Sequence, residues 1–403
     1  MTRRLPPARR FGALAFAPAL LALLGALSVT ACSTLPPPTA AVSTEKRAFA
    51  DAIRVAVDGL VQQVAPPSGL LAQRERRIVV LDPTLDAGTG QQTAATLQLD
   101  KAVADGLAKS SAALDVQPFD AANLAKAHFL LTGTLQRSQG AYGVNLALVD
   151  VKSATVAAQS SAMARPEGID MQPLAYYRDS PVRVKDKVID GYVRTATTPP
   201  GQKADAVYLQ RIAAATVIND ATLLYNAGRY REALAEYRSA LATPAGDQIR
   251  ALNGIYLANV KLGQTAEAEE AFGRLVAYGI AYNNLGVKFL FNPGSTDFWS
   301  DPKVTGAYAM WLRQIARQGG NAKACMDVVG HSSSTGTEAV NDALSLRRAA
   351  VIKRRLGTES PEMLNRLRTQ GMGAKQNIVG TGTDDVVDAL DRRVEFAIID
   401  CPA

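Results

Sequence analysis

Histidine and cysteine are scarce in this 403-residue sequence, which has two histidines and three cysteines. The histidines, His128 and His331, fall in different predicted domains, and no C-x-x-C pair occurs. These absences leave no residues for a His-rich metal site, so we expect neither a metal nor another cofactor. After residue 31 there is also no apolar run of about 18 residues, so we expect no membrane-spanning helix in that part.

Motifs of the common enzyme classes are missing too. The segment from Gly88 to Thr93 follows a predicted strand and opens a predicted helix, as a phosphate-binding loop would, but it has no lysine and the wrong spacing. We interpret it as a helix cap. No G-x-S-x-G, H-E-x-x-H or protein-kinase motif occurs, and Asp82 and Asp86 lack the flanking oxygen ligands of a calcium loop. The sequence therefore predicts a protein that is not an enzyme.

The basic excess is small once the N-terminus is set aside. The formal net charge is +7, and four arginines within the first ten residues supply +4 of it, which leaves the rest of the chain near +3. No long basic block occurs, so we expect no nucleic-acid partner. The 372 residues after position 31 are enough for two or three domains with cores of their own.

The N-terminus combines those arginines with a Leu/Ala-rich run and small residues before Cys32. This arrangement is typical of a secretory signal rather than of a spanning helix. Residues 29–32, Val-Thr-Ala-Cys, resemble the lipobox of bacterial lipoproteins. The resemblance implies that Cys32 is lipidated and becomes the mature N-terminus; the alternative is a cleaved signal with an incidental cysteine. Ser33 stands where an aspartate would suggest inner-membrane retention, which implies an outer-membrane anchor facing the periplasm.

The pattern along the chain predicts an α+β protein of several domains. Residues 1–31 are the signal peptide and 32–45 a Pro- and Ala-rich tether. Residues 46–200 begin with a helix and then alternate strand and helix patterns in the order β-α-β-α-β-β-β, before an irregular or partly helical connector. This order resembles small α/β domains of other periplasmic lipoproteins, in pattern only.

Residues 205–280 are alanine-rich and contain an internal repeat. Gly228, Ala233 and Tyr237 are echoed 35 positions later by Gly263, Ala268 and Phe272. The period resembles that of tetratricopeptide repeats, in which a glycine allows the turn, an alanine allows close helix approach and an aromatic ring fills a groove; the alternative is a plain helical hairpin. Two copies are few for a solenoid, so we expect this block to pack against a neighbouring domain.

Three ordered motifs mark residues 285–403. A Gly330-His331 pair precedes a Ser/Thr/Gly loop, then comes a helix with Asn341, Leu344 and Arg348, and finally a strand entered through Arg392 and Arg393. These motifs resemble those of the OmpA-like domains found in OmpA C-termini and in peptidoglycan-associated lipoproteins. The resemblance implies an α/β sandwich that binds a peptidoglycan stem peptide.

The resemblance also points to six binding residues: Ser333, Asn341, Leu344, Arg348, Asp391 and Arg393. We expect Arg348 to hold a ligand carboxylate through two parallel hydrogen bonds. The family's aspartate, which binds the ammonium of diaminopimelate, is replaced by Ser333, and the family's asparagine by Asp391. One hypothesis is that Asp391 restores the missing carboxylate; the other is a domain that kept its fold and lost tight binding. Only one of the two adjacent arginines can face the groove, and Arg393 is favoured slightly. His331 is interpreted as a turn residue.

Cys325 and Cys401 remain after Cys32 is used by the lipid. If the strand that ends at His331 and the strand that begins near Arg393 are antiparallel neighbours, the two cysteines face each other at the far end. We therefore predict a disulfide, the alternative being two buried free thiols.

Together these features predict an outer-membrane lipoprotein that binds peptidoglycan non-covalently and tethers or scaffolds envelope components. The alternative is a periplasmic regulatory or assembly factor that acts by protein binding, as an activator of peptidoglycan synthases or as part of a secretion apparatus. A protein partner would then bind the helical block or the N-terminal domain.

Overall fold

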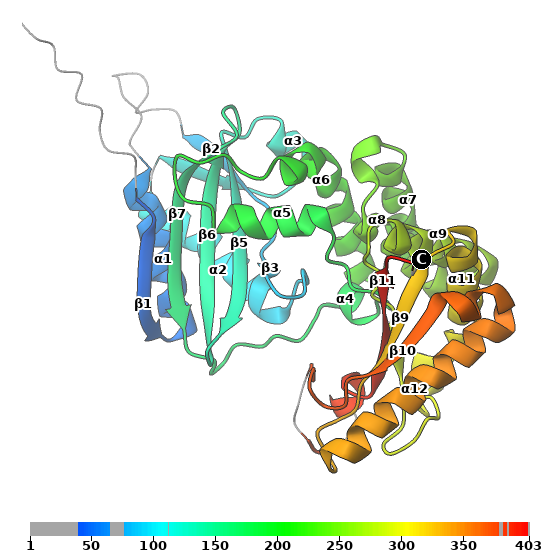
Figure 1. The fold of residues 1–403 in the computed structure, drawn as a ribbon. Coiled ribbons are helices and arrows are strands. Elements are labelled where there is room, and N and C mark those ends of the chain that lie inside the picture. The colour runs from blue at the N-terminus through cyan, green and yellow to red at the C-terminus, as the bar shows by residue number, and fades with distance from the viewer. Residues whose placement is uncertain (1–38, 65–75, 112, 379–381, 385–386, 402–403) are drawn as a thin grey trace, which may run out of the picture. The chain divides into compact units, whose positions relative to one another are not determined.

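The computed structural model describes residues 39–64, 76–111, 113–378, 382–384 and 387–401 (Figure 1). The predicted signal peptide and Cys32 lie outside the described residues. The last part of the expected tether, residues 39–45, is described, and there the prediction is wrong. Residues 41–47 form a strand, β1, that pairs in parallel with β7.

The N-terminal domain is built on a seven-stranded sheet in the order β1-β7-β6-β5-β2-β4, with β3 pairing with β5 at the side. Strands β5, β6 and β7 form an antiparallel meander, and β2 runs parallel to both β4 and β5. Its elements are β1 (Ala41–Arg47), α1 (Phe49–Gln63), β2 (Arg77–Leu81), β3 (Leu85–Asp86), α2 (Ala94–Ser110), β4 (Leu114–Gln117), α3 (Ala121–Leu124), β5 (Phe129–Ser138), β6 (Ala141–Asp150) and β7 (Thr155–Ala164). The predicted order of the longer elements holds for residues 77–164.

Helices cover both faces of this sheet. The apolar side chains of α1 and α2 pack on one face, around Ile53, Leu60 and Leu99. The other face is covered by α5 (Lys187–Ala196) and the start of α6 (Ala206–Asn226), and α5 crosses in front of β5 and β6 in Figure 1. The segment expected to be a connector is thus partly helical, with α4 (Ala175–Arg178) and α5, and completes the domain's second apolar layer.

The predicted cap before α2 is observed. Thr93 accepts a hydrogen bond from the backbone N–H of Thr96, and the Thr96 hydroxyl reciprocates by accepting from the backbone N–H of Thr93. Both side chains are buried. The Gly88–Thr93 segment therefore ends in a capping box.

The helical block comprises α6, α7 (Tyr230–Leu241), a short 3-10 turn η1 (Pro244–Gly246), α8 (Ile249–Lys261) and α9 (Thr265–Ala281). The two repeated segments occupy equivalent places. Gly228 and Gly263 have φ values of 76° and 71°, the left-handed conformation expected at the turns before α7 and α9. The repeated alanines are buried, and the repeated aromatic rings, Tyr237 and Phe272, are fully buried.

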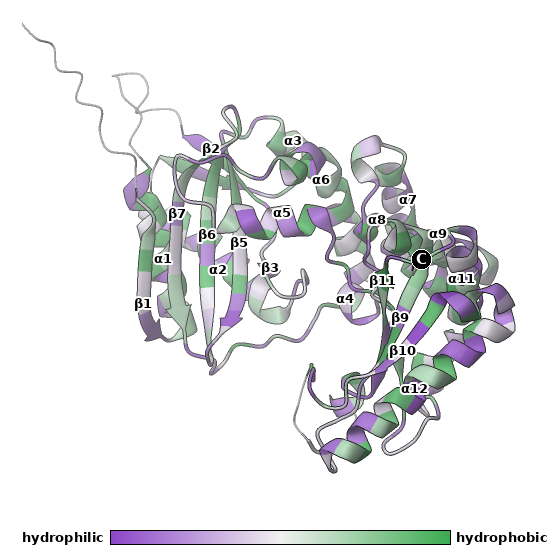
Figure 2. Cartoon of the chain, viewed as in Figure 1, coloured by the Kyte–Doolittle hydropathy of each residue, from purple (hydrophilic) through white to green (hydrophobic). Residues whose placement is uncertain are grey.

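The C-terminal domain has a four-stranded sheet in the order β10-β9-β11-β8. Strand β10 is parallel to β9, and β11 is antiparallel to both of its neighbours. In Figure 2, β9 and β11 are mostly in the hydrophobic colour, whereas α12 alternates between hydrophobic and hydrophilic. The elements are β8 (Phe289–Leu290), α10 (Pro302–Thr305), α11 (Tyr308–Asn321), β9 (Cys325–Gly330), α12 (Glu338–Glu359), η2 (Pro361–Arg366), β10 (Leu367–Gly371), η3 (Val387–Leu390) and β11 (Arg393–Ile399).

A single apolar core joins the helical block to this domain. Trp311 on α11 stacks on Phe272 of α9, with ring centroids 5.5 Å apart, and its indole nitrogen donates to the Tyr256 hydroxyl at 2.9 Å. The same cluster extends into the sheet through Phe289 and Val394. The expected packing of the helical block against a neighbour is therefore observed, and the core is continuous across residues 280–285.

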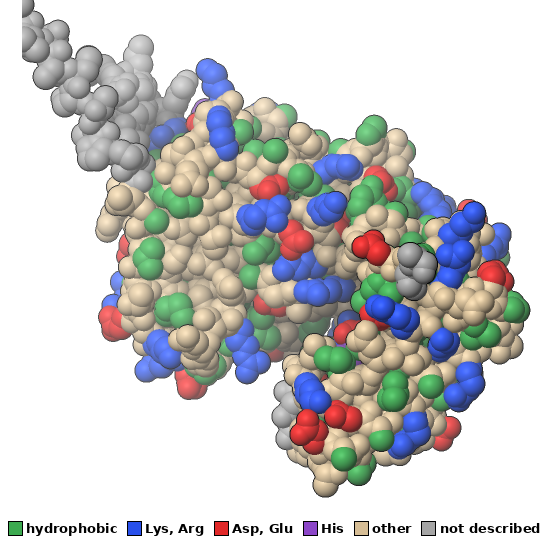
Figure 3. All heavy atoms as spheres, viewed as in Figure 1, with side chains coloured by type: hydrophobic (Ala, Val, Ile, Leu, Met, Phe, Trp, Pro, Cys, Tyr) green, Lys and Arg blue, Asp and Glu red, His purple; other side chains and the backbone are tan. Residues whose placement is uncertain are grey.

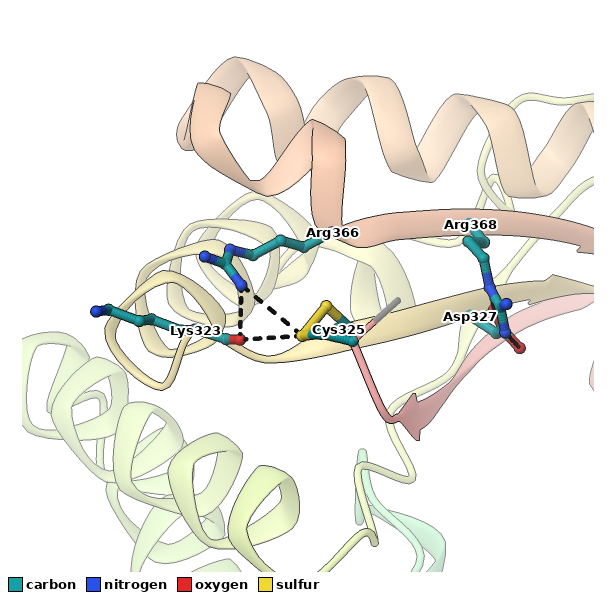
Figure 4. Close-up of a disulfide and its surroundings, with 6 residues drawn as sticks. Lys323, Cys325, Asp327, Arg366 and Arg368 are labelled. Carbon is teal, nitrogen blue, oxygen red and sulfur yellow. Dashed lines mark hydrogen bonds and ion pairs between the residues drawn. A yellow bond between two sulfur atoms is a disulfide. The ribbon is translucent and has the colours of Figure 1, made fainter. Parts of the chain in front are cut away.

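The predicted disulfide joins the C-terminal strand pair. In the register of β9 and β11, Cys325 faces Ile399, so Cys401 lies just beyond the paired residues. The two cysteines are disulfide-bonded, with Cα atoms 5.1 Å apart. Figure 4 shows Arg366 beside this bond, where its guanidinium donates to the backbone carbonyl of Lys323 at 2.9 Å.

The surface carries charges of both signs. On the face drawn in Figure 3, acidic side chains lie among the basic ones. Within the described residues, no helix has the length and apolar character needed to cross a membrane.

Candidate functional site

The loop between β9 and α12 lies at the end of the C-terminal sheet where β11 begins. His331 donates its backbone N–H to the carbonyl of Arg393, and Ser332 donates to that of Gly373. Gly330 is required at the strand end, because a Cβ there would lie 1.9 Å from the carbonyl oxygen of Ser345. Backbone contacts from both neighbouring segments therefore hold the loop in place.

Three side chains of this region form a compact polar cluster. Ser333 and Thr335 donate their hydroxyls to the two carboxylate oxygens of Asp384, at 2.5 Å and 2.6 Å, and the hydroxyls lie 3.1 Å from each other. Ser333 is buried, whereas the side chain of Asp384 is 29% exposed. The Asp384 carboxylate is therefore partly accessible to solvent, whereas the Ser333 hydroxyl belongs to a buried residue.

The backbone on the Asp384 side is also held. The buried carboxylate of Asp388 accepts from the backbone N–H groups of Thr383 and Asp384 at 2.8 Å and 3.0 Å. Gly382 approaches the loop so closely that a Cβ would meet the Ser334 hydroxyl at 2.8 Å. Hydrogen bonds to its backbone therefore fix Asp384 in position beside Ser333.

Arg392 supplies the positive charge behind the cluster. Its guanidinium lies 3.0 Å from Asp384 Oδ1, donates to the carbonyl of Phe291 and packs over the ring of Trp299 at 5.3 Å. Burial opposes ionisation of Asp384, but hydrogen bonds from Ser333 and Thr335 and the guanidinium of Arg392 outweigh it and hold the pKa of Asp384 below its ordinary value. Asp384 is therefore a carboxylate at neutral pH.

The guanidinium of Arg348, which was predicted to hold a ligand carboxylate, is bonded to backbone groups. It is fully buried, and its three nitrogens donate to the backbone carbonyls of Ser295, His331 and Asn292 at 2.8–3.0 Å. Burial, and after it the charge of Arg392, lowers the pKa of Arg348 to about 10. The guanidinium therefore links the backbone of the loop after β8 to the backbone of the loop after β9, in which Ser333 lies.

Asp391 and Arg393 contact other groups. Asp391 is fully buried and accepts the backbone N–H of Ile378 at 2.6 Å, whereas the carboxylate bonded to Ser333 is that of Asp384. Arg393 pairs with Glu395 at 3.1 Å and donates to the carbonyl of Gln376. Of the two adjacent arginines, Arg392 is the one that contacts the cluster, and the preference for Arg393 stays a prediction.

The remaining predicted residues lie on α12 or beside the loop. Asn341 and Leu344 are 5% and 7% exposed and belong to the buried side of the helix. His331 is fully buried, with Nε2 3.3 Å from Glu395 Oε1. In the part of the chain that the structure describes, no group of three or more His, Cys, Asp or Glu side chains could hold a metal ion.

Sequence reasoning missed Thr335, Asp384 and Arg392. Thr335 lies two residues after Ser333, so its proximity was foreseeable, and Arg392 was weighed and ranked second. Asp384 is 51 residues from Ser333, and no spacing rule relates the two. The contact between this carboxylate and the loop is seen in the structure alone.

Comparison with known proteins places the C-terminal region in a family. The sequence model of the OmpA family matches residues 290–389. No curated protein matches the chain. Among solved structures, the peptidoglycan-associated lipoprotein from Burkholderia pseudomallei is 19% identical and is covered over 89% of its length by 28% of this chain, with a TM-score of 0.24.

Two further structures match a similar share of the chain. The cell wall anchor of the T6SS from Pseudomonas aeruginosa is 24% identical, with 27% of this chain covering 74% of it and a TM-score of 0.22. The periplasmic domain of Helicobacter pylori MotB is 18% identical, with 28% covering 71% and a TM-score of 0.22. Because these identities and TM-scores are low, the match to the family model carries the assignment: residues 290–389, about a quarter of the chain, are an OmpA-family domain.

Proposed function

We propose that residues 285–403 bind peptidoglycan non-covalently, through its stem peptides, at the loop that contains Ser333. The supporting observation is that the polar cluster overlaps the region that matches the OmpA family. Ser333, Thr335 and Asp384 of the polar cluster lie within the residues that match the OmpA family, and Arg392 follows three residues after the end of the match. A stem peptide offers carboxylates and ammonium groups, which such a cluster can recognise by charge-assisted hydrogen bonds.

We also propose that the protein is anchored to the outer membrane by a lipid on Cys32 and faces the periplasm. This part rests on the lipobox-like residues 29–32 and on Ser33. An N-terminal lipid and a C-terminal peptidoglycan-binding domain would tether the two layers or scaffold components between them. The proposed activity is binding, without catalysis.

The alternative, a regulatory or assembly factor, is supported by the large part of the protein that lies outside the family match. The N-terminal domain and the helical block extend from Ala41 to Ala281, outside the family match. In this alternative they bind an envelope protein, and the C-terminal domain only localises the complex. Co-purification of envelope proteins with the full chain, before and after the peptidoglycan is digested, tests it, because a partner that the protein itself binds stays attached when peptidoglycan is removed.

Sedimentation with purified sacculi tests the peptidoglycan proposal. The mature chain without lipid is expected to pellet with sacculi and to be released by soluble stem peptides. A chain that stays in the supernatant at all sacculus concentrations, while remaining folded by circular dichroism, would contradict the proposal.

A further inference from the structure

The carboxylate nearest to Ser333 comes from a part of the chain that the family resemblance did not mark. We propose that Asp384 recognises an ammonium group of the stem peptide, and that Ser333 and Thr335 are positioning residues that orient its carboxylate. The inference rests on the proposed function of this site and names the residue and the ligand group involved.

The geometry places the Asp384 carboxylate where a side chain at position 333 would also reach. Ser333 Oγ lies 2.5 Å from Asp384 Oδ1, so the serine hydroxyl and the aspartate carboxylate are direct neighbours in the cluster. A serine cannot itself supply a negative charge. The short neutral side chain of Ser333 therefore lies beside an acidic side chain from another part of the chain. Asp384 supplies the carboxylate that Ser333 lacks.

Asp384 retains capacity for one more donor. A carboxylate has about four lone-pair positions. Among the described residues, Asp384 Oδ1 accepts from Ser333 and Arg392, whereas Oδ2 accepts from Thr335 alone. The side chain is 29% exposed, so a ligand can approach it. The remaining position on Oδ2 suits a primary ammonium, which donates up to three hydrogen bonds.

The order of charges favours a cation over an anion as ligand. The Arg392 side chain is 0% exposed and lies behind Asp384, whereas the carboxylate is the exposed member of the pair. Arg392 and the two hydroxyls keep Asp384 ionised, as its lowered pKa indicates. A ligand that reaches the cluster from solvent therefore meets a fixed negative charge first.

The test compares sacculus binding by the mature chain and by Asp384→Asn, with Asp400→Asn as the control. Asparagine keeps an acceptor for Ser333 and removes the charge, and Asp400 is an exposed aspartate beside the disulfide at the other end of β11. We expect Asp384→Asn to weaken binding about tenfold or more. We expect Asp400→Asn to change it less than twofold.

The second part of the test moves the carboxylate from position 384 to position 333. Ser333→Asp in the Asp384→Asn background is expected to recover most of the lost affinity, because the charge returns to the same pocket. Ser333→Asp alone is expected not to tighten binding, because two carboxylates would then lie within hydrogen-bond distance and one would take up a proton. Failure of the double variant to recover affinity while folded would argue against a charge-based role.

Chemical acetylation of the free amines of the sacculi provides an arm that needs no variant. It is expected to weaken binding of the unmodified protein by about the same factor as Asp384→Asn, and to have no further effect on that variant. If the unmodified protein does not bind native sacculi at all, the proposed function fails. If it binds, but acetylation and Asp384→Asn leave binding unchanged or tighter, the role of Asp384 is overturned and the proposed function stands.

Discussion

The charged side chains around the candidate site are mostly buried rather than lining an open groove. Arg348, Arg392 and Asp391 are each 0% exposed. Their charges are tolerated because they are bonded to backbone groups or to opposite charges: Arg348 to three carbonyls, Arg392 to Asp384 and a carbonyl, and Asp391 to the N–H of Ile378. Sequence motifs identify such residues but do not say which side of the loop they face.

Arg348→Ala is expected to destabilise the C-terminal domain. The substitution leaves three backbone carbonyls, of which that of His331 is fully buried, without their donors and removes the packing of the guanidinium over Phe291. The expected cost is about 3 kcal/mol or more, seen as a lower midpoint of thermal or urea unfolding. Arg347→Ala, on the exposed side of α12, is the control and should change the midpoint little. Loss of sacculus binding by Arg348→Ala at an unchanged midpoint would instead mean that Arg348 contacts the ligand.

A buried carboxylate in the N-terminal domain predicts a pH dependence of stability. Burial, opposed by the hydrogen bond from Tyr208 and the charge of Arg250, raises the pKa of Asp82 to about 6 from 3.8. Because the folded state disfavours ionisation, the penalty is absent below about pH 4 and is complete above about pH 6. Stability should therefore fall by about 2–3 kcal/mol as the pH rises through this window.

Asp82→Asn checks this pH dependence. The asparagine can still accept from the Tyr208 hydroxyl but cannot ionise. Thermal unfolding measured across this window should show a melting temperature that falls with rising pH for the parent chain and falls less for the variant. Parallel curves for the two proteins would assign the pH dependence to other groups.

At the scale of elements, the sequence predicted features that obey a local rule and missed those that depend on distant partners. The strands predicted at 128–135, 142–150 and 155–162 correspond to β5, β6 and β7. The capped helix after Thr93 and the glycine turns of the helical block also follow from local periodicity and turn residues. Strand β1 was missed because a Pro- and Ala-rich context hides a segment whose pairing partner, β7, lies more than 100 residues away.

Helix α5 and the position of Asp384 illustrate two reasons why a feature was not located from the sequence. For α5 a signal was present: Asp186 caps the helix, and the buried side chains of Val188, Ile189 and Tyr192 have helical spacing. For Asp384 no signal was present, because its hydrogen bond to Ser333 joins two residues 51 positions apart in the sequence. Local helix chemistry can be found by a closer look at the sequence, whereas a contact between two loops requires the structure.

The disulfide supports the C-terminal sheet at the end opposite the candidate site. It closes a chain segment with a sequence separation of 76 residues, for which the chain-entropy model gives a stabilisation of roughly 4 kcal/mol. Reduction, or the double substitution Cys325→Ala and Cys401→Ala, is expected to lower the unfolding midpoint of this domain. Mass spectrometry of unreduced protein should find these two thiols blocked. A reductant that lowers the midpoint of the double variant as well would show that its effect does not act through this bond.

At the scale of the whole molecule, the apolar core joins the helical block to the OmpA-family domain. Tyr256, Phe272 and Trp311 belong to it together with Val394 of the C-terminal sheet. Polar contacts also link the segment before α5 to the N-terminal domain, where Lys185 donates to the carbonyl of Ala87 and Arg183 to that of Gly88. The helical block therefore contributes to the fold of the domain that carries the candidate site, beyond any part in binding a partner.

The first strand makes the proposed lipid anchor short. Only nine positions separate Cys32 from Ala41, where β1 begins, so even a fully extended chain would span about 30 Å between them. If Cys32 carries the lipid, the N-terminal domain stays within that distance of the membrane, and the C-terminal domain is the part left to reach peptidoglycan. Membrane attachment and sacculus binding should then be separable.

Cys32→Ala tests that separation. The variant is expected to lose membrane attachment and to appear in the soluble periplasmic or secreted fraction, because the lipid is the only anchor that the sequence suggests. Purified from that fraction, it should pellet with sacculi as well as the delipidated parent does, since the Ser333 loop and Asp384 lie in a different domain from the tether. Cell fractionation in high salt measures the first effect, and sedimentation measures the second. A variant that still partitions with the outer membrane in high salt would contradict the anchor, whereas a soluble variant that no longer binds sacculi would contradict the independence of the two ends.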